Sequence, residues 1–206
     1  MSASNLARWG GLSAVAGGIF LIIWAFLLIL IFNPTGVPGS LYRLYVALDS
    51  FSWLLLIGGL VGLYARQANA SGWLDAAGLA LASSGGSIMA VLSLAYAEQP
   101  MPGPYSWGDG SGRGVAVLLW EAGLLLLGLA TLRARTPPLP WKALPLAIFL
   151  IFPLSIAATP LMLGAGLESE FFYSGVPRVL TGIGWVLLGY ALWSESGEDA
   201  RQPAAV

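Results

Sequence analysis

Apolar residues recur along this chain in six long runs, separated by short segments rich in polar residues, glycine and proline. Each run has about the length that a helix needs to cross ~30 Å of hydrocarbon at ~1.5 Å per residue. We therefore expect residues 1–206 to form one all-α domain, a polytopic membrane helix bundle. The six predicted spans are Trp9–Phe32, Leu44–Tyr64, Trp73–Tyr96, Gly114–Leu132, Trp141–Leu163 and Val176–Trp193.

The ends of the predicted spans suggest an internal period. A tryptophan opens each odd-numbered span, and an arginine lies within two residues of the start of each even-numbered span. Two interpretations remain open: three helical hairpins repeated in parallel, or the enrichment of tryptophan and arginine at membrane interfaces in general. The residues in question are Trp9, Trp73, Trp141, Arg43, Arg113 and Arg178.

Composition supports the membrane assignment and excludes several kinds of chemistry. Hydrophobic residues make up 57% of the chain and charged residues 9%, whereas a soluble domain carries about 25% charge. The chain has no cysteine and no histidine, which removes disulfides, thiolate metal sites and the usual haem ligand and proton shuttle. We expect no metal and no cofactor, and the net charge of −1 argues against nucleic acid as a partner.

The distribution of lysine and arginine between the loops predicts the orientation. If the N-terminus is cytoplasmic, six of these residues lie inside and three lie outside. Positive charge favours the cytoplasmic side. The sequence therefore predicts a multi-pass protein of a bacterial inner membrane with both termini in the cytoplasm.

Glu121 is the most unusual residue of the predicted spans, because it lies midway along the fourth one. A charge at that depth costs about 2.5–3.5 kcal/mol on insertion scales, so we expect the side chain to face the bundle interior. We predict a neutral, hydrogen-bonded carboxyl that joins helices; a proton or cation site is the alternative. The candidate partners at similar depth are Ser83, Ser84, Ser87 and Thr181.

Asp49 lies near the start of the second predicted span, in its outer third. It can form a structural ion pair with Arg113 or Arg178 from another hairpin. Alternatively, it belongs to an outward-facing polar pocket around which the three outer arginines converge. Such a pocket suits an anionic or lipid-like ligand. Its candidate residues are Arg43, Asp49, Glu98, Arg113 and Arg178.

Three phrases of the sequence resemble small uncharacterised bacterial membrane proteins with six helices. They are Arg8-Trp9-Gly10-Gly11-Leu12, Gly62-Leu63-Tyr64-Ala65-Arg66 and Leu187-Leu188-Gly189-Tyr190-Ala191-Leu192. The resemblance spans the chain and implies a six-helix fold, but it implies no particular activity.

Two functional hypotheses follow, and neither is enzymatic, because no nucleophile–base pair is evident. The first is a non-catalytic subunit or partner of a larger membrane assembly, which would contact lipids and either a protein partner or a second copy of the chain. The second is a transport or ligand-binding module with the outward-facing pocket described above.

Overall fold

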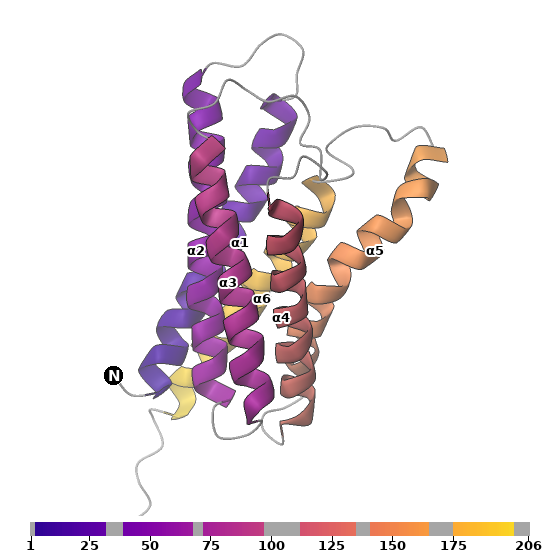
Figure 1. The fold of residues 1–206 in the computed structure, drawn as a ribbon. Helices are drawn as coiled ribbons and strands as arrows, with labels where there is room; N and C mark the ends of the chain where they lie inside the picture. Colours follow the sequence, from indigo (N-terminus) through magenta and orange to yellow (C-terminus); the bar gives the residue numbers. More distant parts are fainter. Residues whose placement is uncertain are drawn as a thin grey trace, which may run out of the picture.

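The computed structural model of the chain is an all-helical bundle (Figure 1). It describes residues 3–31, 39–67, 72–96, 112–134, 141–164 and 175–199. A short 3-10 turn, η1 (Trp141–Ala143), precedes the fifth helix. The six α-helices are α1 (Ala3–Ile31), α2 (Gly39–Gln67), α3 (Trp73–Tyr96), α4 (Arg113–Arg133), α5 (Leu144–Gly164) and α6 (Val176–Asp199).

The helices coincide with the predicted spans but often extend beyond them. The prediction for α3 is confirmed at both ends, whereas α1 begins six residues before Trp9 and α6 continues to Asp199. The length of an apolar run predicts only the part of the helix that lies in the hydrocarbon core of the membrane. A helix continues into the interface because its backbone hydrogen bonds remain satisfied there.

Each helix packs against its neighbours in sequence, and α1 also packs against α6, which closes the bundle into a ring. Glycines allow the closest approaches, as is common between membrane helices. A Cβ added to Gly11 of α1 would lie 2.7 Å from the carbonyl oxygen of Gly189 in α6. A Cβ added to Gly182 would lie 2.6 Å from the carbonyl oxygen of Gly18. Two backbones therefore meet where larger residues would hold them apart.

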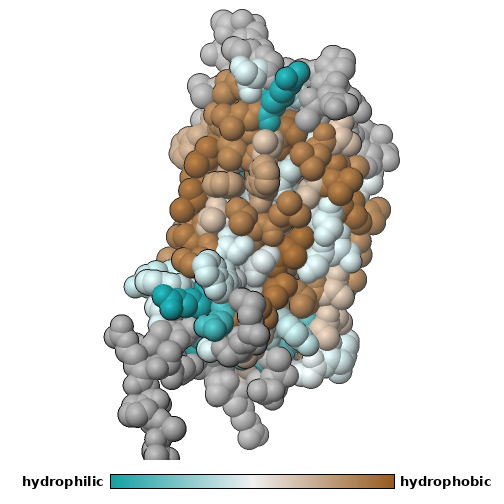
Figure 2. Space-filling view, turned by 90° about the vertical axis from the view of Figure 1, so that its left-hand side faces the viewer, coloured by the Kyte–Doolittle hydropathy of each residue, from teal (hydrophilic) through white to brown (hydrophobic). Residues whose placement is uncertain are grey.

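The surface of the bundle is that of a membrane-embedded protein. Figure 2 shows hydrophobic side chains over the middle of one face, with the strongly hydrophilic ones near its two ends. Exposed residues include Phe26, Leu54, Val91 and Leu118, each at least half accessible. Five of the described helices are long and apolar enough to cross a membrane. For α5, the corresponding apolar stretch is the shorter segment Leu144–Ala158.

Helix α5 is the most loosely packed part of the ring. It begins beside α4 and leans away from the bundle towards its C-terminal end (Figure 1). Among the side chains described between Leu144 and Ala158, only Pro145 and Ile148 are buried. Pro145 lies in the first turn, where a helix tolerates proline, whereas Pro153 lies inside the helix and removes a backbone donor.

The repeat of three hairpins stays a prediction. The ring order places α1 beside α2, α3 beside α4 and α5 beside α6, which is the order that three successive hairpins would produce. The same order arises in any bundle whose short loops join neighbouring helices, so packing alone does not distinguish the two interpretations.

Candidate functional site

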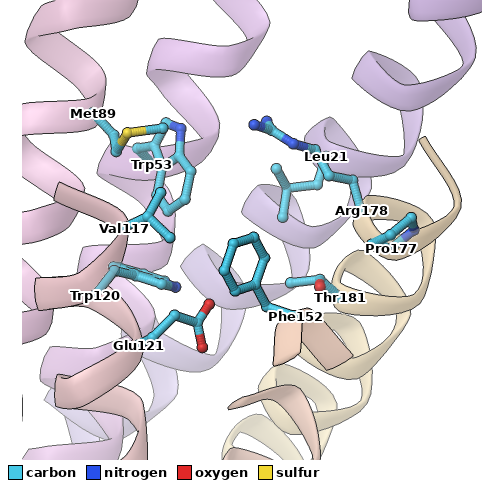
Figure 3. Close-up of a pocket in the computed structure, with 10 residues that line it drawn as sticks. All are labelled: Leu21, Trp53, Met89, Val117, Trp120, Glu121, Phe152, Pro177, Arg178 and Thr181. Carbon is cyan, nitrogen blue, oxygen red and sulfur yellow. The ribbon is translucent and has the colours of Figure 1, made fainter. Parts of the chain in front are cut away.

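A pocket lies between the helices, and every one of the six helices contributes to its lining (Figure 3). We call it the central pocket. Its volume is about 80 Å³. On the same measure one water needs about 10–15 Å³, so the space holds on the order of six waters or a ligand of similar size. Its apolar lining includes Leu21 of α1, Met89 of α3 and Val117 of α4.

Aromatic residues form much of the remaining wall. Trp53 of α2 and Trp120 of α4 have ring centroids 5.0 Å apart and planes at 88° to each other. Both rings line the pocket, together with Phe152 of α5. Behind them, the fully buried ring of Trp185 in α6 lies 5.9 Å from Trp120. The three tryptophans therefore tie the even-numbered helices together at the centre of the bundle.

Trp120 and Trp185 are not among the site residues that the sequence predicts. A signal was present, because each follows an arginine by seven residues: Arg113 precedes Trp120, and Arg178 precedes Trp185. Seven residues correspond to about two helical turns, so the arginine and the tryptophan lie on nearly the same face. A tryptophan on the inward face, well inside a span, is not explained by interfacial anchoring.

Glu121 points into the central pocket, where its carboxyl lies towards Phe152 and Thr181 in Figure 3. The prediction that it faces the bundle interior agrees with this position. Its Oε2 atom is buried and has no hydrogen-bond partner among the described residues. This oxygen atom is therefore buried between the helices without a hydrogen bond that would join them.

The predicted hydrogen bonds from Glu121 to the serines of α3 are wrong. Ser84 and Ser87 are exposed, and the buried Oγ atom of Ser83 has no hydrogen-bond partner among the residues that the structure describes. Gly85 packs directly on Ala116 and Trp120 of α4, and each residue of a helix is rotated by ~100° from the last. Its neighbour Ser84 therefore points away from α4. Ser84 and Ser87 lie at a depth similar to that of Glu121, but their side chains do not point towards it.

Thr181 is the one predicted partner that shares the pocket with Glu121. It follows Arg178 by three residues and lies one turn further into α6. Its hydroxyl adds a polar group to a lining that is otherwise mostly apolar and aromatic. The pocket thus combines one carboxyl, one hydroxyl and one guanidinium with several aromatic rings.

Asp49 pairs with Arg178, one of the two arginines that the sequence left open. Arg178 NH1 donates to Asp49 Oδ1 at 2.7 Å, and Ser93 Oγ donates to Asp49 Oδ2 at 2.6 Å. The Asp49 side chain is 6% exposed and that of Arg178 is 20% exposed. We call these three residues the Asp49 network. It joins α2, α3 and α6 through charge-assisted hydrogen bonds, which are stronger than neutral ones.

An aromatic stack holds the other side of the Arg178 guanidinium. The Cζ atom lies 3.8 Å from the ring centroid of Trp24 in α1. The Trp24 ring stacks in turn on Tyr45, with centroids 4.7 Å apart. A guanidinium over an indole face gains a cation–π attraction. The charge of Arg178 is therefore balanced by Asp49, and the position of its guanidinium is held by Trp24.

The three outer arginines do not share the central pocket, and their convergence on an outer pocket stays a prediction. Arg178 lines the central pocket, Arg43 is exposed, and Arg113 is not among the lining residues. Glu98 lies outside the residues that the structure describes. The arginines share a place in the sequence of each even helix. Of the three, Arg178 is the one that lines the central pocket, and it contacts Asp49 and Trp24.

Two further observations bear on the chemistry. Within the described residues, no group of three or more acidic side chains is placed to hold a metal ion. Comparisons with protein-family models, curated proteins and solved structures find no match for this chain. The central pocket is therefore the feature of the molecule that bears most directly on its function.

Proposed function

We propose that this protein is a non-catalytic, membrane-embedded module that binds or transports a small ligand in the central pocket. The observation that carries the proposal is Glu121, a carboxyl directed into a pocket that all six helices enclose. Ionisable residues inside membrane spans are costly and mark ligand or ion pathways in many membrane proteins. The absence of histidine and cysteine from the chain favours binding over catalysis.

A purely structural role does not account for Glu121. Buried polar atoms in native proteins are nearly always hydrogen-bonded, yet its buried Oε2 has no partner among the described residues. By contrast, both carboxylate oxygens of Asp49 are bonded to other helices. Asp49 therefore has a structural role, whereas Glu121 is left available to a ligand or to water.

A pocket-filling substitution tests the proposal. Val117 lines the pocket, whereas Val115 lies two residues away on the exposed face of the same helix. We expect native mass spectrometry of the purified protein to detect a retained small molecule in the wild type and in Val115→Trp. The same molecule should be absent from Val117→Trp, provided that this variant has a normal melting temperature.

Equal retention in the two tryptophan variants, or no retained molecule in the wild type, would count against the pocket as a binding site. Thr181→Leu provides a second, smaller change in the same lining. It should weaken retention without destabilising the bundle, since Thr181 is only partly buried.

The second candidate function is that of a subunit of a larger membrane assembly. One observation favours it: small residues of α3 face outward in a row, and small residues let membrane helices approach closely. This role predicts a protein partner, or a second copy, that co-purifies independently of the pocket and is lost on Ala80→Leu. The row consists of Ala76, Ala80, Ser84 and Ser87.

The proposal includes a location. The resemblance to bacterial membrane proteins and the six-to-three excess of lysine and arginine support an inner-membrane protein with both termini in the cytoplasm. In that orientation the Asp49 network lies towards the outside, and Glu121 lies near the middle of the membrane.

A further inference from the structure

The charges of the central pocket do not cancel. Its lining contains two ionisable side chains, Arg178 and Glu121. Arg178 is neutralised by Asp49 at 2.7 Å, so its positive charge is already satisfied within the protein. None of the described lysines or arginines forms an ion pair with Glu121. An ionised Glu121 would give the pocket a net negative charge.

This balance changes the expected class of ligand. The sequence favoured an anionic ligand because three arginines were expected to converge. In the structure, an anion entering the pocket would compete with Asp49 for Arg178 and would approach Glu121, a group of like charge. A cation in the pocket would instead be attracted to Glu121, because it supplies the positive counter-charge that an ionised Glu121 lacks.

The aromatic lining narrows the class further. Trp53 and Trp120 meet at 88° and form two adjacent walls, and Phe152 provides another aromatic surface near Glu121 in Figure 3. Aromatic faces attract cations, most strongly where water is excluded, and cages of this kind recognise quaternary ammonium groups. The protein already uses the interaction nearby, with Arg178 over Trp24.

The oxygen content of the lining argues against a bare metal cation. Hard divalent cations take about six to eight oxygen ligands, but within the described part of the lining the side-chain oxygens come only from Glu121 and Thr181. The remaining lining is apolar, aromatic or cationic. An alkylated ammonium matches this mixture, because its methyl groups suit the rings and its charge suits the carboxylate.

We infer that the central pocket binds a small organic cation, an ammonium compound whose charge is met by Glu121 and whose alkyl groups pack on Trp53, Trp120 and Phe152. This inference rests on the proposed function and specifies the ligand class for the same site. It assigns Glu121 as the counter-ion and the three aromatic residues as the walls that receive the alkyl groups.

The test compares choline with its uncharged carbon isostere, 3,3-dimethyl-1-butanol. Binding of each is measured by calorimetric titration of the purified full-length protein in nanodiscs. We expect choline to bind roughly ten- to a hundredfold more tightly than the isostere, the usual scale for a charge-assisted contact. Glu121→Gln should remove this preference. Stronger or equal binding of the isostere to the wild type would overturn the cation assignment while leaving the pocket function intact.

A matched pair of α5 variants tests the aromatic wall. Both Phe152 and Phe149, one turn earlier, pack against the buried hydrophobic core, but only Phe152 of the two lines the pocket. Phe152→Leu should weaken choline binding several-fold, and Phe149→Leu should leave it unchanged. Equal losses in both variants would show that the aromatic surface of Phe152 has no specific role.

Cysteine labelling removes the dependence on a folded Glu121 variant, because the chain has no cysteine of its own. A Val117→Cys protein keeps Glu121 and places a thiol in the lining. A trimethylammonium methanethiosulfonate should modify it at least tenfold faster than the sulfonate reagent of similar size, relative to their rates at Val115→Cys. Faster anionic labelling would overturn the cation assignment. Failure of both reagents to enter, with no choline or isostere bound, would overturn the proposed function as well.

Discussion

Asp49 and Glu121 are two acids in one bundle whose surroundings give them different roles. Asp49 receives hydrogen bonds on both oxygens and faces a guanidinium, so its charge is a part of the fold. Glu121 faces a pocket. Sequence position alone did not separate them, because both are carboxyls in apolar spans; the difference lies in which side chains the neighbouring helices present.

Removing the charge of Asp49 should destabilise the bundle. In Asp49→Asn, the mostly buried guanidinium of Arg178 loses its counter-ion, and breaking such a pair costs roughly 3 kcal/mol. We expect a loss of that order in the free energy of unfolding, measured by denaturant titration in micelles. Arg43→Gln is the control, since Arg43 is exposed and surface substitutions change stability by about 0.5 kcal/mol or less. Similar losses in both variants would contradict a structural role for the pair.

At the scale of helices, glycine contacts set the distances between elements. A Cβ on Gly85 of α3 would lie 2.5 Å from the carbonyl oxygen of Ala116 and 2.6 Å from the backbone nitrogen of Trp120 in α4. Backbone atoms cannot rotate aside as a side chain can. The two helices must therefore separate before the position accepts a larger residue.

Gly85→Ala should consequently lower the free energy of unfolding by roughly 1–3 kcal/mol, the usual cost of overpacking. Gly114→Ala, in the first turn of α4, is the matched substitution, because a Cβ there meets nothing within 4 Å. It should be neutral or slightly stabilising, since alanine favours the helix. Thermal unfolding of the two variants side by side measures the difference, and a tolerant Gly85 would refute the close packing.

The sequence predicted the elements well and their relative rotation poorly. The ends of α3 were predictable because apolar length and breakers define them. The inward direction of Glu121 was predictable because lipid excludes charge. Its pairing with serines was not, because which faces meet depends on packing: Gly85 rather than Ser84 contacts α4. The Asp49 partner was narrowed to two arginines, and the rotation of α6 selected Arg178.

At the scale of the whole molecule, the orientation can be tested with single cysteines in the cysteine-free chain. Ala3 and Ser40 lie at the starts of the neighbouring helices α1 and α2, and both are exposed. With both termini cytoplasmic, an impermeant thiol reagent should label Ser40→Cys in intact cells. Ala3→Cys and Ser194→Cys should react only after the membrane is opened. Labelling of Ala3→Cys in intact cells would reverse the orientation, and a difference between Ala3→Cys and Ser194→Cys would contradict an even number of crossings.

The loose packing of α5 against the other helices affects how fast a ligand can enter and leave the central pocket. Few of its described side chains are buried, and regions with few buried apolar contacts open at the lowest free-energy cost. We expect its backbone amides to exchange with deuterium faster than those of α2 at equal membrane depth, as followed by mass spectrometry. Comparable protection in the two helices would contradict this. Because α5 carries Phe152 into the central pocket, each opening of α5 would remove one wall. The residence time of a bound molecule would then be set by how often this one helix departs, rather than by how strongly the other five hold it.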